Sequence, residues 1–118
     1  MTHKLEIKDG KIKVEFEGLE KLEAIKNKLE FNLSNVVSVS TEDKKWIQGL
    51  RVGGTALPGV IKEGRYLLKD GKKAFFAMKN KDKCITIEFK NEAYDYLVIE
   101  VDNKEEIAKQ IKEAAGLQ

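Results

Sequence analysis

The strongest constraint on the fold is the alternation of apolar and charged residues in two short runs that flank Asp9-Gly10. The runs are Leu5–Lys8 and Lys11–Phe16. A period of two places the apolar side chains on one face of a strand and the charged ones on the other. Asp-Gly between two such runs is typical of a tight β-hairpin. The sequence therefore predicts an antiparallel hairpin with one face in the core and one in water.

The apolar period lengthens to three or four residues after this hairpin. Over residues 18–27 leucine and isoleucine recur at helical spacing with charged residues between them, which predicts a short amphipathic helix. Alternation then returns over Leu29–Leu33 and over Val36–Ser40. We expect two further strands there, separated by a break at Ser34-Asn35.

Strands also dominate the second half of the chain. Four runs with strand character follow, namely Gly64–Lys69, Lys72–Met78, Cys84–Phe89 and Tyr96–Val101. Asp70-Gly71 between the first two predicts another hairpin, and we expect the remaining strands to follow one another as a meander. Within the third run, alternation predicts that Thr86 faces outward, opposite the isoleucines.

A helix is expected at the C-terminal end. Asp102-Asn103 offers N-cap residues, and a glutamate three positions on resembles a capping box. An apolar stripe follows that includes Ile107, Ala108 and Ile111, and Gly116 can end the helix. Because such a stripe must be covered, we expect this helix to plug the open end of a bent sheet.

These elements define one fold class. We predict a single domain over residues 1–118, of α+β class and mainly antiparallel β, with about seven strands in a bent sheet or barrel. A short helix follows the first hairpin and a second helix closes the domain.

The order of elements, together with several segments, resembles a family of small bacterial proteins with a pleckstrin-homology (PH)-like fold. The segments are GLEKLEAI at 18–25, LSNVVSV at 33–39, GLRVGGTALPGVIKEGRY at 49–66 and YDYLVIEVDNKEEI at 94–107. The resemblance implies a PH-like barrel and a binding or assembly role, and it implies no reaction. Lipid-binding members use a basic loop, whereas the turn at Asp9-Gly10 is too short to wrap a headgroup, so lipid binding is not carried over.

The net charge and the small numbers of cysteine and histidine residues exclude several functions. Lysine and arginine total 22 against 20 acidic residues, so the net charge of +2 does not predict nucleic-acid binding. Cys84 is the single cysteine and His3 the single histidine, which leaves no disulfide and no zinc cluster. We expect neither metal nor cofactor. With no secretory signal and no long apolar run, we expect a cytoplasmic protein.

Three kinds of candidate site remain. The first is the glycine-rich stretch 50–60, where Arg51 and Thr55 are candidate binding residues for a carboxylate or a phosphate, and Trp46 shortly before it is a further candidate for binding a partner. It lacks the lysine of a phosphate-binding loop, and a bend made by glycine and Pro58 explains its composition without a ligand.

The second kind is a weak anion or membrane-headgroup site on exposed lysines, and the third is a thiol enzyme. The candidate anion contacts are Lys8, Lys11, Lys13, Lys69, Lys72 and Lys73. Such lysines more often protect sheet edges. Cys84 could be activated by the nearby lysines, but the sequence offers no convincing base beside it.

We therefore interpret the sequence as that of a non-enzymatic binding or assembly module. Its partner is expected to be a protein, with self-association as one form, and addition of a peptide to a sheet edge is the matching mode. No nucleic-acid partner is expected, and membrane association is not favoured.

Overall fold

The computed structural model describes residues 2–17, 28–42, 55–57, 61–67, 71–78 and 81–117. Three strands come first, β1 (Thr2–Lys8), β2 (Lys11–Glu17) and β3 (Lys28–Asn32), followed by the 3-10 turn η1 (Leu33–Asn35) and by β4 (Val36–Ser40). The next elements are β5 (Thr55–Leu57), β6 (Ile61–Leu67), β7 (Lys73–Met78) and the 3-10 turn η2 (Lys81–Lys83). The chain continues with β8 (Cys84–Phe89), β9 (Tyr96–Glu100) and the helix α3 (Lys104–Ala114). The predicted helix over 18–27 lies outside the described residues.

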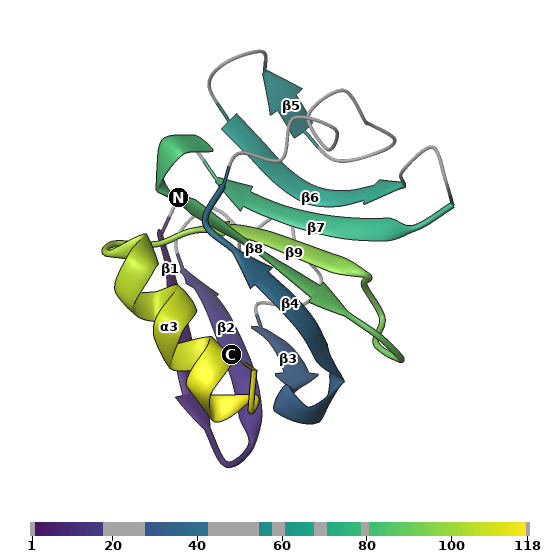
Figure 1. The fold of residues 1–118 in the computed structure, drawn as a ribbon. Helices are drawn as coiled ribbons and strands as arrows, with labels where there is room; N and C mark the ends of the chain where they lie inside the picture. The colour runs from purple at the N-terminus through teal and green to yellow at the C-terminus, as the bar shows by residue number, and fades with distance from the viewer. Residues whose placement is uncertain are drawn as a thin grey trace.

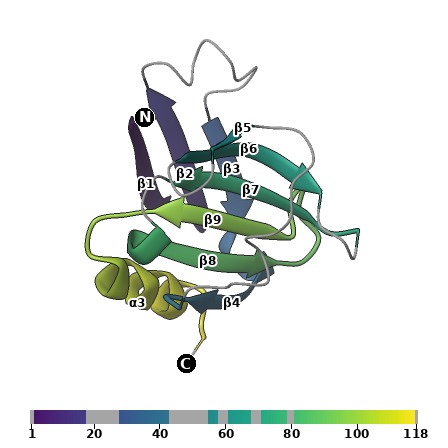
Figure 2. The ribbon, with the colours of Figure 1, turned by 90° about the horizontal axis from the view of Figure 1, so that it is seen from above.

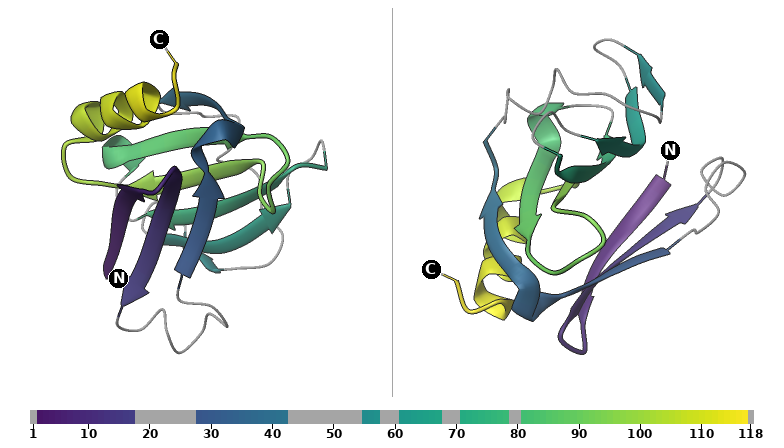
Figure 3. Two further views of the ribbon diagram at one scale, coloured as in Figure 1. Left: turned by 90° about the horizontal axis from the view of Figure 1, so that it is seen from below. Right: turned by 90° about the vertical axis from the view of Figure 1, so that its right-hand side faces the viewer.

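The described strands form two open sheets, so the closed barrel considered from the sequence is wrong. One sheet has three strands in the order β1-β2-β3, and the other has six in the order β4-β8-β9-β7-β6-β5. The two sheets face each other at an angle, and the chain turns from one to the other at η1 between β3 and β4 (Figures 1 and 3). The α+β class with mainly antiparallel strands is confirmed.

The predicted first hairpin is confirmed. Lys8 pairs with Lys11, so Asp9 and Gly10 alone make the turn, with φ angles of 55° and 73°. Two successive residues with positive φ define the turn that best matches the right-handed twist of a hairpin. β3 then pairs with the other side of β2, also antiparallel.

The large sheet contains a pair of parallel strands that was not predicted from the sequence. β8 and β9 form a hairpin, but β9 also pairs in parallel with β7, from Ala74 opposite Tyr96 to Ala77 opposite Ile99. The chain therefore passes from β7 across the position of β9 before it enters β8, and the expected meander is wrong (Figure 2). The hairpin of β6 and β7 is present, but Leu67 pairs with Lys73. Its connection is therefore longer than the expected two-residue turn at Asp70-Gly71.

The main core lies between the two sheets and α3. It is made of buried residues from both sheets and the helix, among them Ile12, Val14, Phe31, Val39, Ile85, Ile87, Leu97, Ile99, Ala108 and Ile111. Ala108 and Ile111 belong to the predicted apolar stripe of the helix, and both are buried. The helix runs beside β4 and β8 and covers that part of the core (Figure 1). The expected packing of the helix is thus confirmed, although it covers an open sheet rather than the end of a barrel.

The opposite face of the central strands is buried as well. Its residues form a second cluster consisting of Ala74, Phe76, Met78, Cys84, Tyr96 and Val98. Thr86 lies on the same face and is only 6% exposed, so the prediction that it faces water is wrong. The physical reason is that central strands of a sheet covered on both faces carry buried residues at every position, whatever their alternation.

The ends of α3 use residues with positive φ. Asn103 occupies the N-cap position with φ 57° and ψ 57°, and its side chain makes no capping hydrogen bond. The capping box expected from the sequence therefore does not form, although Asn103 marks the start as expected. Gly116 has φ 77°, and the Leu117 N–H donates to the Lys112 carbonyl at 2.8 Å, which closes the last turn.

Candidate functional site

β4 is the outermost strand of the six-stranded sheet. It pairs with β8 from Ser38 opposite Glu88 to Ser40 opposite Thr86, and within the described part of the chain no strand pairs with its other side. An outermost strand presents backbone N–H and C=O groups that another extended chain can use. The outer edge of β4 is therefore a candidate binding surface.

The side chains of β4 are uncharged throughout. The strand reads Val-Val-Ser-Val-Ser, with Val36 and Val39 buried in the main core. Val37 is 44% exposed and is the one large apolar side chain found exposed among the residues whose side chains the structure describes. The exposed Ser38 hydroxyl donates to Glu88 Oε1 at 3.3 Å. β4 thus combines an anchored backbone with uncharged outer side chains, next to which stands the carboxylate of Glu88 on β8.

The other described edge strands differ from β4. β1 carries Lys4, Glu6 and Lys8 on its outer face, and β3 carries Lys28 and Glu30. Charges along an edge oppose pairing with another chain because they would have to be desolvated beside it. β5 is only three residues long. β4 is therefore the edge least protected against an added strand.

Both ends of β4 are held in place. The register shifts between Val36 and Ser38, which marks a bulge at the start of the strand. At its other end Lys104 of α3 donates from Nζ to the Thr41 carbonyl at 3.2 Å, and the Glu42 N–H donates to Ser40 Oγ at 3.1 Å. The bonds at Thr41 and Ser40 fasten the C-terminal end of β4 to α3 and to the turn that follows the strand.

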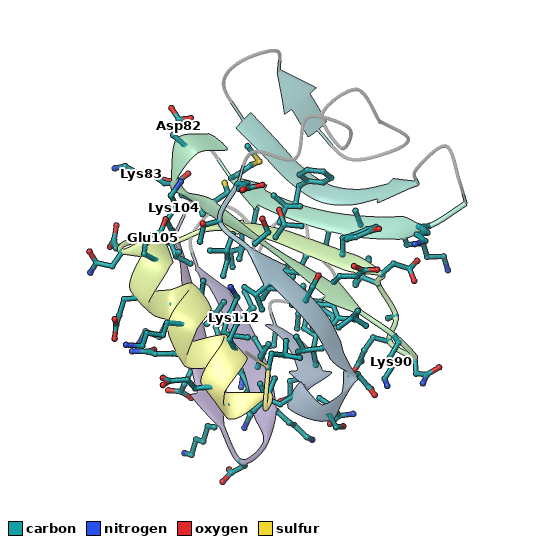
Figure 4. All side chains as sticks on the ribbon, viewed as in Figure 1. Asp82, Lys83, Lys90, Lys104, Glu105 and Lys112 are labelled. Atoms are coloured by element: carbon teal, nitrogen blue, oxygen red, sulfur yellow. The ribbon has the colours of Figure 1, made fainter. Side chains whose placement is uncertain are left out.

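A shallow depression lies at the start of α3. It is lined by Asp82, Lys83, Val101, Asp102, Asn103 and Lys104. Figure 4 shows Asp82, Lys83, Lys104 and Glu105 gathered at this end of the helix, whereas Lys90 lies beyond the far end of β8. The Lys104 ammonium is engaged by Thr41, and the Lys83 carbonyl accepts a bond from the Val101 N–H at 3.0 Å. The depression is open and mixed in charge, so its chemistry selects no ligand.

The predicted anion contacts Lys8, Lys11 and Lys13 lie on the outer face of the small sheet, where acidic residues offset them. The register places Glu6, Lys13 and Glu30 in one row across the three strands, and Lys4, Glu15 and Lys28 in the next. Lys11 Nζ lies 3.8 Å from Glu30, and Lys28 Nζ lies 3.7 Å from Glu15. A third row holds Lys8, Lys11 and Asn32 and no acidic residue. Because two of the three rows mix charges and Lys11 lies near Glu30, the net field of this face is weak and it attracts anions poorly.

The second lysine group is not gathered into one site either. Lys72 Nζ lies 3.5 Å from the Tyr96 hydroxyl and 5.5 Å from the centre of its ring. Lys73 is exposed, and its backbone N–H donates to Asp95 Oδ2 at 2.9 Å. Lys69 lies outside the described residues, so the structure does not bring the predicted trio together.

The candidate residues of the glycine-rich stretch are largely untested. Trp46 and Arg51 lie outside the described residues. Thr55 begins β5, with its backbone opposite Glu63 of β6, and its side chain lies outside the description. The roles predicted for these three residues stay predictions.

Cys84 and the carboxylates of the β8–β9 loop take part in packing and hydrogen bonding within the fold. Cys84 is 6% exposed and belongs to the second buried cluster. Glu92 Oε2 accepts bonds from the Asn32 N–H at 2.8 Å and from Asn35 Nδ2 at 2.9 Å. Asp95 accepts the Lys73 N–H, as described above. Glu92 thus links the two sheets, whereas Asp95 joins the loop to the start of β7 within the large sheet.

The described residues were found to hold neither a metal-binding cluster nor a membrane-spanning helix. The described residues contain no group of three His, Cys, Asp or Glu side chains placed to hold a metal ion. None of the described helices is long and apolar enough to cross a membrane. No family model matches the chain, and comparison with curated proteins and with solved structures gives no match. The PH-like fold therefore stays a prediction from the sequence.

Proposed function

We propose that this chain is a non-enzymatic, cytoplasmic binding module that accepts an extended segment of a partner protein as an added strand on β4. The observation that carries the proposal is the neutral outer edge of β4, with Val37 exposed in its middle. In strand addition the backbone hydrogen bonds supply affinity, and neighbouring side chains select the sequence.

The anchoring of β4 favours such binding. Val36 and Val39 pack in the main core, and β8 pairs with the inner side of the strand. A strand that is already ordered loses little conformational entropy when a partner arrives, so more of the interaction energy appears as affinity. The exposed Val37 side chain adds apolar area that an incoming β-branched residue can cover.

Other observations make the rival functions less suitable. A thiol enzyme needs a sulfur that its substrate can reach, and Cys84 is buried. An anion or headgroup site needs lysines without nearby acids, whereas Lys11 and Lys13 share the small sheet with Glu6 and Glu30. The PH-like resemblance, which implies a binding or assembly role, supports the same proposal independently of β4.

Selection from a displayed library of random linear peptides tests the proposal. We expect peptides that bind the wild-type chain to share a short uncharged segment rich in β-branched residues. These peptides should lose binding to Ser38→Lys, in which a charge stands on the edge of β4, and keep binding to Ser34→Lys. Ser34 is exposed in η1, so this control carries the same substitution four positions before Ser38. Recovery of no peptide, or equal binding to both variants, would contradict the proposal.

A further inference from the structure

We infer that the partner segment on β4 can be β4 of a second copy of this chain, so that two large sheets join edge to edge about a two-fold axis. This inference rests on the proposed function, since both use the same edge. It goes further by naming the occupant.

The side chains of β4 match a second β4 better than they match the charged edges β1 and β3, and the other uncharged edge, β5, is only three residues long. In every antiparallel register within Val36–Ser40, each residue stands opposite valine or serine, and no two like charges meet. A β1 edge would instead place Lys4, Glu6 or Lys8 beside the exposed Val37. None of the pairs between two copies of β4 places like charges opposite each other, which is the cross-strand arrangement that destabilises a sheet.

Symmetry limits the assembly to two copies. Pairing of β4 with itself is isologous, so it uses the open edge of both copies and leaves none for a third. Pairing of β4 with a different edge would be heterologous and could continue into a filament. Of the remaining described edges, β1 and β3 carry charges that oppose further addition, and β5 is only three residues long.

The size of the contact predicts a weak dimer. Two strands of five residues bury well under the ~1,200 Å² of a standard interface, so dissociation in the micromolar range or weaker is expected. The net charge of +2 adds little repulsion between copies.

Sedimentation velocity of the purified chain from about 10 µM to 1 mM tests the inference. We expect the wild-type chain and Ser34→Lys to shift from monomer toward dimer as concentration rises, and Ser38→Lys to stay monomeric with an unchanged thermal unfolding curve. Amide hydrogen exchange of the wild-type chain needs no variant. Exchange within Val37–Ser40 should slow at high concentration, while exchange in β1 does not change.

The outcomes separate this inference from the proposed function. A wild-type chain that is monomeric over the whole range overturns the inference, and library peptides that still distinguish Ser38→Lys from Ser34→Lys would leave the proposed function standing. A dimer that persists in Ser38→Lys, or that Ser34→Lys also abolishes, places the contact elsewhere and overturns the inference as well.

Discussion

The carboxylate of Glu92, in the loop between β8 and β9, accepts a hydrogen bond at 2.9 Å from the side-chain amide of Asn35 in η1. The two residues are 57 positions apart in the chain, and the bond fastens the corner between the sheets to the large sheet. The same carboxylate oxygen accepts the Asn32 N–H, and the Lys90 N–H donates to the Asn35 carbonyl at 2.9 Å.

We therefore expect Glu92→Ala to destabilise the fold. The variant loses two hydrogen bonds to a charged acceptor, and because water can reach the exposed Asn32 N–H, the free energy of unfolding should fall by about 1–2 kcal/mol. Urea denaturation measures this difference. Glu113→Ala on the exposed face of α3 is the matched control and should change stability by less than about 0.5 kcal/mol. Equal effects of the two substitutions would show that the contact at the corner is not stabilising.

Two valines of β4 should respond differently when each is replaced by alanine. Val39 is 7% exposed and lies in the main core, so Val39→Ala should lower the free energy of unfolding by roughly 1.5–3 kcal/mol through lost apolar burial and a small cavity. Val37 is 44% exposed, so Val37→Ala should cost less than about 0.5 kcal/mol in the monomer. Thermal or urea unfolding at low concentration checks both values. A larger loss of unfolding free energy in Val37→Ala would mean that the Val37 side chain is buried, which contradicts the orientation of β4 described above.

The turn of the first hairpin depends on Gly10. Its φ of 73° lies in the left-handed region, and a Cβ at this position would meet no atom within 4 Å. The cost of Gly10→Ala is therefore conformational, about 1 kcal/mol. Asp9→Asn, which keeps a residue tolerant of positive φ, should be neutral. Unfolding curves of the two variants provide the measurement, and a harmless Gly10→Ala would contradict the turn geometry.

The alternating charges of the small sheet predict weak binding to anionic vesicles. At an ionic strength of about 0.15 M the wild-type chain should not sediment with them, because Glu6, Glu15 and Glu30 offset the neighbouring lysines. Replacing these three glutamates with glutamine leaves the lysines of this face unopposed, and the triple variant should bind in a salt-dependent way. Strong salt-sensitive binding of the wild-type chain would favour the headgroup alternative instead.

Local patterns in the sequence were sufficient to predict most of the strands. Alternation and Asp9-Gly10 indicated the first hairpin, and helical spacing indicated α3. The pairing of β7 with β9 was missed because strand order depends on contacts distant in sequence. A signal for it was present, since Ala74–Met78 and Tyr96–Ile99 are continuous apolar runs, which are typical of strands covered on both faces.

The sequence allowed the type of binding site to be predicted, but not the strand that forms it. Addition of a peptide to a sheet edge was expected, but nothing local distinguishes Val36–Ser40 from a central strand. Its position at the edge depends on β8 occupying one side while no described strand occupies the other. The lysines were predicted to be solvated, and Lys8 and Lys73 are exposed, but the position of Glu6 and Glu30 beside Lys13 depends on cross-strand register, which the sequence does not show by itself.

The position of β9 affects how this chain can assemble during synthesis. β9 is the last strand to leave the ribosome, yet it lies at the centre of the large sheet and joins β8 to β7. The antiparallel ribbon β5-β6-β7 and the pair β4-β8 can form earlier, but they stay separate until residues 96–100 emerge. A nascent chain stalled before this point carries two incomplete sheets with exposed inner edges, which is the state most in need of a chaperone.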